Sequence, residues 1–338
     1  MHVLGFFGGQ RMVQSEPGMF IGPIAAVFGY IIDVIFNIIY GGITVYHSLG
    51  ISIIMLTIIV RTLMLPLAVK TQKSMAAMQK LNPEMQKIRK KYPDKNTESQ
   101  QKMNAEIQKL YADNKVNPLS GCLPLFIQMP LFFGLSFIMN QSYLYVTRLG
   151  LLYSQISAYL IEFMNFETYI QTMNELALPI TPQRMIDNGE INLTLIPDVS
   201  RVLNAFSVNE WNVIFERMPA QYLPALQDLF QQKMAIENFF GMVLTEPTGL
   251  GWPGIMIPFL AVTTAIITSV LTMKMSPATT DQARMQQKIM LTVMPVMMGV
   301  MTIGLPAGVG IFWITSSVYQ IGQQALLNNR AGIPLFSK

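Results

Sequence analysis

Five stretches of the chain are long and apolar enough to form membrane-spanning helices. A helix that crosses the hydrocarbon core needs about 20 predominantly apolar residues. Such stretches cover residues 50–69, 118–146, 252–273, 289–303 and 305–327, with a tight turn between the last two. The pattern therefore predicts an all-α polytopic membrane protein whose core is a bundle of five transmembrane helices.

A sixth apolar stretch, residues 19–40 of the N-terminal segment 1–49, carries a polar stripe. Tyr30, Asp33, Asn37 and Tyr40 recur at spacings of 3, 4 and 3, which places them on one helical face. A helix with one polar and one apolar face is more stable in the headgroup boundary than across the bilayer, where the carboxylate of Asp33 would lie in lipid. We expect an interfacial amphipathic helix and keep a spanning helix as the alternative.

The two long connecting segments differ in charge. Residues 70–117 contain eleven Lys or Arg and five acids, whereas residues 150–251 contain four and eleven. Because cytoplasmic loops carry an excess of Lys and Arg, segment 70–117 is expected inside, together with loop 274–288 and tail 328–338. The acidic segment, 147–251, is expected outside, as is the N-terminus if residues 19–40 are interfacial.

Segment 70–117 has two narrow apolar seams and is predicted to be a helical hairpin that turns at residues 92–96. Thr97 with Gln100 fits a capping box for the second arm, and Pro83 should kink the first. Its candidate docking cations are Lys80, Lys87, Arg89, Lys90 and Lys91. They are either solvated surface or a docking arm for ribosomal RNA or anionic headgroups. No nucleic-acid motif is present, and no DNA partner is expected.

The outward segment, 147–251, is predicted to be a small, mostly helical insertion. Its apolar clusters at 211–215 and 222–240 have helical spacing, and Pro219 and Pro224 are expected to break them. It shows no catalytic or ligand spacing. A single cysteine, Cys122, and two distant histidines argue against a metal site, and 51% hydrophobic against 12% charged residues argue against a soluble enzyme. No cofactor is expected.

Arg61 lies near the middle of the first span, and a guanidinium at that depth should face protein or water. Lys70 is nine residues away, about 13 Å along a helix, so Arg61 cannot simply reach the cytoplasmic surface. The other spans carry polar stripes, namely Gln128, Ser136 and Asn140, then Thr264, Thr268 and Thr272, then Ser316, Gln320, Gln323 and Gln324.

Taken singly, each of these side chains could be explained by a hydrogen bond between helices, with no role in a cavity. Together with Arg61 they favour a hydrated cavity. None of the five predicted spans contains an acid, so the charge of Arg61 is left available to a visiting group. Methionines gather between residues 290 and 301, where they either fill the core or form an adaptable apolar wall.

The runs TIIVRTLMLPL, LNPEMQKIRKKY, GCLPLFIQMPLFFGL and LPAGVGIFWITSSVYQIGQQ resemble the YidC/Oxa1/Alb3 membrane protein insertases. The resemblance covers about 50–148 and 236–327. It implies a five-span core, a groove open to cytoplasm and lipid that contains Arg61, and a basic hairpin needed for activity. It also implies work on nascent membrane proteins, alone or beside the Sec translocon, often with a ribosome. The resemblance further implies that the protein lies in a bacterial plasma membrane.

The compact, Gram-positive-like type is the better fit, although its usual N-terminal lipoprotein cysteine has no counterpart, since the chain's only cysteine is Cys122. The outward insertion exceeds what that type normally has, and the resemblance assigns it no function. Our hypothesis is an insertase and chaperone without covalent chemistry. Arg61 would anchor polar client segments, the polar stripes would form hydrogen bonds, and Trp313 would contact the client helix.

Two other classes of function remain open. A transporter or channel for a small anion could use Arg61 as its ligand, although no convincing internal repeat is present. A structural assembly chaperone would hold folded membrane subunits without inserting them. Saturable anion flux would favour the first alternative, and stable stoichiometric co-purification with one partner would favour the second.

Overall fold

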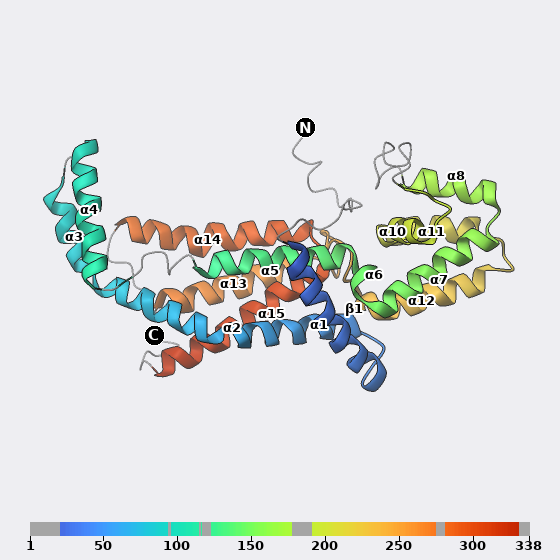
Figure 1. Cartoon of the computed structure of the whole chain (residues 1–338), viewed down its shortest axis with the longest axis horizontal. Coiled ribbons are helices and arrows are strands. Elements are labelled where there is room, and N and C mark those ends of the chain that lie inside the picture. Colours follow the sequence, from blue (N-terminus) through green and yellow to red (C-terminus); the bar gives the residue numbers. More distant parts are fainter. Residues whose placement is uncertain are drawn as a thin grey trace. The chain divides into compact units, whose positions relative to one another are not determined.

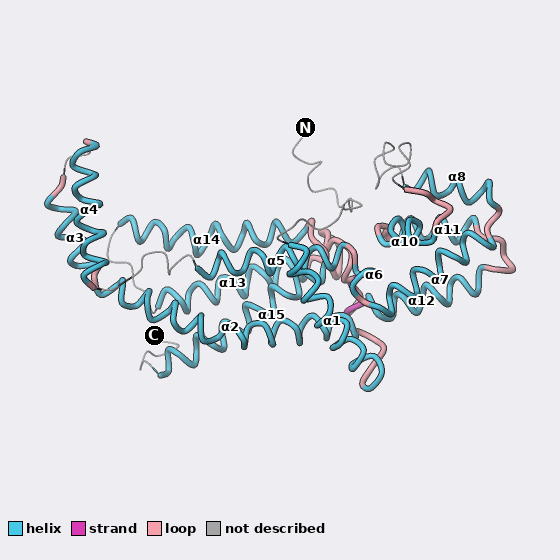
Figure 2. The backbone as a smooth tube through the Cα atoms, in the orientation of Figure 1, coloured by secondary structure: helices cyan, strands magenta, loops and turns pink. Residues whose placement is uncertain are grey.

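The computed structural model describes residues 21–93, 96–114, 116, 123–177, 191–274 and 281–330, and these are helical almost throughout (Figures 1 and 2). The one sheet among them is an antiparallel pair, β1 (Asn238–Phe239) and β2 (Met242–Val243). The expected all-α class is therefore confirmed.

The helices follow one another in the order α1 (Ile21–Gly42), α2 (Ser48–Lys80), α3 (Asn82–Lys91), α4 (Thr97–Asp113), α5 (Leu123–Asn140), α6 (Ser142–Tyr145), α7 (Thr147–Phe163), α8 (Phe166–Ala177), α10 (Ile196–Asn204), α11 (Val208–Arg217), α12 (Leu223–Glu237), α13 (Met256–Lys274), α14 (Asp281–Ile303) and α15 (Ala307–Arg330). The expected helical character of the outward insertion is seen in α7, α8, α10, α11 and α12.

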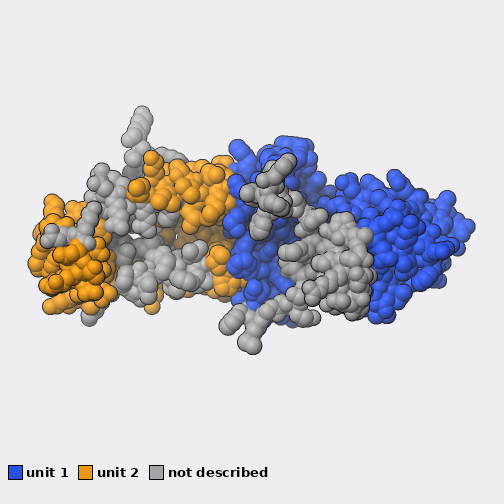
Figure 3. All heavy atoms as spheres, turned by 90° about the horizontal axis from the view of Figure 1, so that it is seen from above, with its two compact units in different colours: residues 1–57, 131–259, 300–313 blue, residues 58–130, 260–299, 314–338 orange. Residues whose placement is uncertain are grey.

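Two compact units make up the chain (Figure 3). Unit 1 contains residues 1–57, 131–259 and 300–313, and unit 2 contains residues 58–130, 260–299 and 314–338. Their boundaries fall within α2, α5, α13, α14 and α15. Arg61 and most of its predicted partners belong to unit 2, whereas the outward insertion belongs to unit 1.

The centre of the insertion is α7, which packs against α6, α10 and α12. Its side chains Tyr153, Ile156 and Leu160 are almost fully buried. On α11, Trp211 is equally buried, with its ring centroid 5.0 Å from that of Phe230 on α12. Pro224 lies in the first turn of α12, where a missing N–H costs nothing, so the expectation that it breaks a helix is wrong.

The start of α15 is packed tightly inside unit 1. A Cβ on Gly308 would lie 2.6 Å from the sulfur of Met139 and 3.1 Å from Ile53, and one on Gly310 would clash with Ile257. Glycine is therefore required at both positions by the close approach of neighbouring side chains. The backbone N–H groups of Ala307 and Gly308 donate to carbonyls of residues 246 and 244, which anchors this end of the helix to the loop after β2.

In unit 2, α3 and α4 form the expected hairpin, with the hydroxyl of Tyr111 donating to the sulfur of Met85 over 2.8 Å. The residue that caps α4 is Asn96, whose side chain accepts from the backbone N–H of Ser99 at 2.8 Å. Thr97 is the first helical residue, so the expected capping box was placed one residue too late. Pro83 belongs to the first turn of α3, after a break at Leu81, and kinks no continuous arm.

Several helices end at residues other than the bounds predicted for the spans. The helix that contains Arg61 continues past Lys70 to Lys80, because the residues beyond Lys70 keep helical hydrogen bonding. The second span stops at Asn140 rather than residue 146, and α6 follows as a separate turn. Residues 281–288, expected in a loop, already form the first two turns of α14.

Two described helices are long and apolar enough to cross a membrane by length and composition, over Ile21–Gly42 and Ser48–Ser74. Shorter apolar stretches occupy Met256–Thr272 and Leu291–Ile303. On α1, Phe28, Ile32 and Phe36 are buried, whereas Tyr30 and Ile38 are largely exposed. The predicted polar stripe is thus only part of the exposed side of this helix.

Candidate functional site

Arg61 is the centre of a polar site in unit 2. It lies on α2, is half-buried, and donates from Nη2 to Oε1 of Gln128 on α5 at 2.8 Å. The amide of Gln320 on α15 is oriented by the same guanidinium, because with its oxygen toward Arg61 it accepts from Nη1 and Nη2 at 2.8 and 2.9 Å. Two neutral amide oxygens therefore hold the guanidinium, and no carboxylate among the described residues compensates its charge.

Two buried polar atoms of these helices lack a hydrogen-bond partner among the described residues. They are Nε2 of Gln128, on the amide that also contacts Arg61, and Oγ of Ser316, one helical turn before Gln320. A buried donor or hydroxyl without a partner costs about 1–3 kcal/mol. Both atoms are therefore suited to hydrogen-bond water or a bound polar group.

Further polar pairs join α2 to α15 in the same unit. The hydroxyls of Thr62 and Tyr319 are 3.2 Å apart, and Gln72 donates through Nε2 to Oε1 of Gln324 at 2.5 Å. Sequence reasoning missed Thr62, Tyr319 and Gln72. The first span was predicted to end at residue 69, so Gln72 was assigned to the hairpin segment 70–117. The residue spacing could have found it, because positions 61 and 72 share one helical face.

Not every predicted wall residue offers a donor to the site. The hydroxyls of Thr264 and Thr268 donate to the carbonyls of Leu260 and Thr264 at 2.7 and 2.8 Å, within their own helix. Only their lone pairs remain for a ligand. Gln323 is half-buried on α15, one turn after Gln320.

Three predicted site residues belong to unit 1 and are not brought together with Arg61 in one unit. Ser136 accepts through its carbonyl from the side chain of Asn140, whose own carbonyl accepts from Asn204 at 2.7 Å. Trp313 stacks on Phe132, with ring centroids 5.0 Å apart. These side chains have local structural partners in that unit, and their role toward a client stays a prediction.

The candidate docking cations lie at the end of α2 and along α3, and all are exposed. Lys80 ends α2 and does not belong to the hairpin arm. Lys91 forms an ion pair with Glu106 across the hairpin at 3.1 Å. The hydrogen bond and charge of Glu106 raise the pKa of Lys91, and the same contact lowers the pKa of Glu106. Lys91 therefore braces the hairpin.

The methionines of α14 that were expected either in the core or in an adaptable wall are mostly exposed. Met294, Met297 and Met301 are each between 38 and 49% exposed. Core filling therefore does not explain them, and they are free to contact lipid or an apolar ligand. Among the residues that the structure describes, no group of three His, Cys, Asp or Glu side chains could hold a metal ion.

Residues 41–332 match the family model of the 60 Kd inner membrane protein. The chain is also similar to the membrane protein insertase YidC of Oceanobacillus iheyensis, with 27% identity over 282 residues, which is 82% of this chain and 74% of that protein.

Two shorter matches are stronger in identity. The membrane protein insertase YidC 1 of Lactococcus lactis is 51% identical over 96 residues, 28% of this chain and 34% of that protein. The membrane protein insertase MisCA of Bacillus subtilis is 49% identical over 85 residues, 25% of this chain and 33% of that protein. In these two matches the chain spans about a third of the relative's length.

Proposed function

The chain belongs to the 60 Kd inner membrane protein family, the YidC/Oxa1 family, and on that premise we propose that it is a membrane protein insertase. It binds the polar, outward-going segment of a nascent membrane protein beside Arg61 and releases the apolar segment into the bilayer. Its clients are nascent membrane proteins and its medium is the lipid bilayer. The reaction is transfer by binding, without covalent chemistry.

The observation that carries this proposal is the uncompensated charge of Arg61. A cation near the bilayer centre costs about 2.5–3.5 kcal/mol on insertion scales. Glutamine oxygens at 2.8–2.9 Å orient the guanidinium without neutralising it. A carboxylate of a client therefore gains a charge-assisted hydrogen bond that the protein does not supply itself, worth about 1.5–3 kcal/mol.

The orphaned atoms of Gln128 and Ser316 support a hydrated site around that charge. Water or the backbone of an extended client segment can satisfy both, since each atom lies on a helix that faces Arg61 or its partner. Polar residues of the client thus leave bulk water for hydrogen-bonding side chains of the site and not for hydrocarbon. The length of hydrocarbon that they must cross is shortened accordingly.

Release follows from the apolar part of the client. Burying about 20 apolar residues in lipid is strongly favourable at roughly 25 cal/mol per Å² of apolar surface. The single ion contact at Arg61 is weaker than this gain, so the client leaves the site without nucleotide hydrolysis. Exposed methionines on α14 provide a surface that adapts to different apolar helices.

The proposed topology has five spans, with the α3–α4 hairpin and the C-terminus in the cytoplasm and the insertion outside. We place α1 in the outer headgroup boundary, because Asp33 accepts from the backbone N–H and the hydroxyl of Thr147 at 2.8 Å and so caps the first helix of the insertion. The basic hairpin, with the Sec translocon and the ribosome as candidate partners, remains part of the proposal.

Substitution of Arg61 tests the function. Purified variants in liposomes are supplied with two in vitro synthesised clients that differ only in an acidic or a glutamine-substituted translocated tail. We expect Arg61→Ala to reduce insertion of the acidic client about tenfold and Arg61→Lys to retain it, since a charge-assisted hydrogen bond accounts for that factor. Protease protection of the tail measures insertion.

Equal insertion by Arg61→Ala and the unsubstituted protein would exclude this role for the guanidinium. Lys70→Ala is the matched control, because it removes an exposed cation from the same helix, α2, outside the contacts of Arg61, and should leave insertion of both clients unchanged or nearly so. Saturable anion flux through client-free liposomes would instead support an anion transporter.

A further inference from the structure

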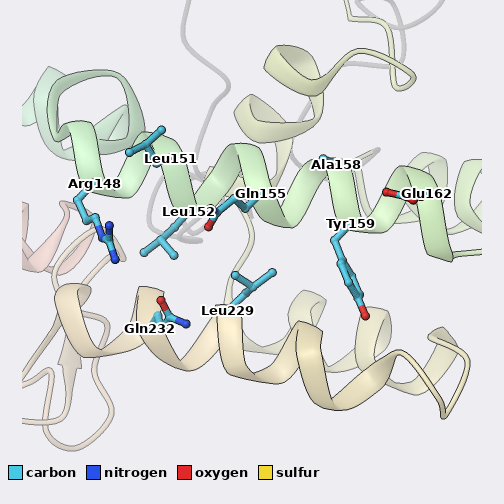
Figure 4. Close-up of a pocket in the computed structure, with 9 residues that line it drawn as sticks. All are labelled: Arg148, Leu151, Leu152, Gln155, Ala158, Tyr159, Glu162, Leu229 and Gln232. Carbon is cyan, nitrogen blue, oxygen red and sulfur yellow. The ribbon is translucent and has the colours of Figure 1, made fainter.

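A groove between α7 and α12 lies in the outward insertion, apart from the residues around Arg61. Its volume is about 560 Å³, within the range of about 300–1,000 Å³ found for binding pockets. Leu152 and Tyr159 of α7 point toward α12, and Leu229 and Gln232 of α12 point toward α7 (Figure 4). All of these residues belong to unit 1.

The α7 side of the groove is one continuous helical face. Arg148, Leu151, Gln155 and Glu162 follow one another at spacings of 3, 4 and 7, which keeps them in one row along the helix. Leu151, one turn after Arg148, is 54% exposed. The row has four turns, about 21 Å at the helical rise, with a cation at one end and a carboxylate at the other.

The charges at the two ends are not used by ion pairs within the described part of the insertion. Its other cations are engaged, as Arg217 pairs with Glu175 at 2.7 Å and Lys233 with Glu237 at 2.9 Å. Arg148 contacts the face of the Tyr40 ring, with Cζ 5.4 Å from the centroid, which leaves its N–H edge for a carboxylate.

We propose that this groove binds an amphipathic helix of a partner polypeptide. The helix has about four turns, a leucine-like stripe that packs on Leu151 and Leu229, an acidic residue at the Arg148 end and a Lys or Arg at the Glu162 end. Charge complementarity at both ends selects the partner, and Leu151 and Leu229 supply the apolar contact.

A helix fits better than a lipid headgroup or a small anion. A phosphate group would engage Arg148 and leave the leucines and Glu162, about 21 Å away, without a role. Side chains that repeat every three to four residues match the ridges of a third helix packed against two others. The site needs no Arg61, so it can be tested independently of insertion.

The experiment measures binding of fluorescent peptides to the full-length protein in nanodiscs of zwitterionic lipid. Three helical peptides of about 16 residues share one leucine stripe and carry Glu and Lys, two Glu, or two Lys at their ends. The unsubstituted protein should prefer the Glu and Lys peptide. Arg148→Glu should prefer the peptide with two Lys, and Glu162→Lys the peptide with two Glu, each by about fivefold.

Two controls keep the outcome decisive. Glu167→Lys makes the same charge change as Glu162→Lys but lies on α8, outside the groove, and should leave every peptide preference as it was. Leu151→Asp should weaken the binding of all three peptides. Preferences that do not follow the charge variants, or no binding up to ~1 mM, would overturn the proposal. So would an effect of Arg148→Glu that appears only in nanodiscs with anionic lipid, which would assign the arginine to headgroups.

Discussion

Lys233 and Arg61 are both withdrawn from water, the first fully and the second in part, and their surroundings differ. Lys233 of α12 is 2% exposed and pairs with Glu237, which is fully buried and also accepts from Tyr153 and Thr245 at 3.2 and 3.0 Å. Arg61 is half-buried, and its hydrogen-bond partners among the described residues are the amides of Gln128 and Gln320. The first charge is neutralised inside the fold and the second is not.

The difference separates an ion that stabilises the fold from the ion that we propose binds clients. Three aromatic rings lie about 5.4–5.5 Å from Nζ of Lys233, those of Tyr153, Trp211 and Phe230, so the ammonium has no room for a ligand. Thr245 in turn belongs to the loop whose backbone holds the start of α15. Lys233 and Glu237 therefore join parts of unit 1, whereas the guanidinium of Arg61 is oriented and left with charge to offer.

The largest expected effect is loss of stability when Lys233 is removed. Lys233→Ala leaves Glu237 as a buried, unpaired carboxylate, which should lower the free energy of unfolding by about 3–5 kcal/mol. Chemical denaturation of the full chain in detergent, followed by tryptophan fluorescence, measures it. The double variant Lys233→Met with Glu237→Gln should recover much of the loss, because no net charge stays buried. An equal loss in both variants would mean that packing, not charge, dominates at this site.

The next largest effect is on function and not on stability: Arg61→Met should impair insertion and leave the free energy of unfolding nearly unchanged. Burial of the guanidinium is itself costly, and its removal offsets the loss of two hydrogen bonds, so the free energy of unfolding should stay within about 1 kcal/mol of the unsubstituted value. Insertion of an acidic client should fall about tenfold, as for Arg61→Ala. A destabilisation as large as that of Lys233→Ala would show that Arg61 is also a structural ion.

A third change should give Arg61 a neutralising partner, like the one that Lys233 has in Glu237. Gln320→Glu places a carboxylate where an amide oxygen now accepts from both terminal nitrogens of Arg61, which gives the guanidinium a built-in counter-ion. Insertion of acidic clients should then fall severalfold although Arg61 is intact. Gln323→Glu, three residues along the same helix, adds the same charge and should have the smaller effect. Comparing the two variants in the liposome assay checks this, and equal losses would contradict it.

The central contact of the candidate site could be predicted from sequence, because it depends on helix faces within long apolar stretches. Arg61, Gln128 and Gln320 were expected on facing stripes, and the structure brings them together. Ser136 and Asn140 share the stripe of Gln128 but lie in the other unit, where the amide of Asn204 donates to the carbonyl of Asn140. The hydrogen bond from Asn204 helps to end α5 at Asn140. The periodicity of residues 123–140 carries no information about a partner 64 positions away in the sequence.

Lys233 shows a second limit of sequence reasoning. Lys and Glu four residues apart on an amphipathic helix are the ordinary pattern of a solvated surface pair. Their burial depends on Tyr153, 80 positions earlier, and on the aromatic side chains of α11 and α12, none of which the local pattern identifies. The site of Arg61 could be predicted because its two partners, Gln128 and Gln320, lie on polar stripes of long apolar helices, which have few alternatives for burial.

The smallest expected effect concerns a third cation, Lys91, which is paired like Lys233 but exposed. Because water and salt screen its contact with Glu106, Lys91→Gln should leave global unfolding unchanged and only increase hydrogen exchange locally in α3 and α4. The folded-state pKa of Glu106 is lowered, so the contribution of the pair is present at neutral pH and is lost as pH falls through that lowered pKa. The variant and the unsubstituted protein should therefore exchange alike at acidic pH and in high salt. A difference that persists under both conditions would mean that Lys91 acts through packing of its alkyl chain on Tyr92, and exposure alone would then not separate the structural cations from the others.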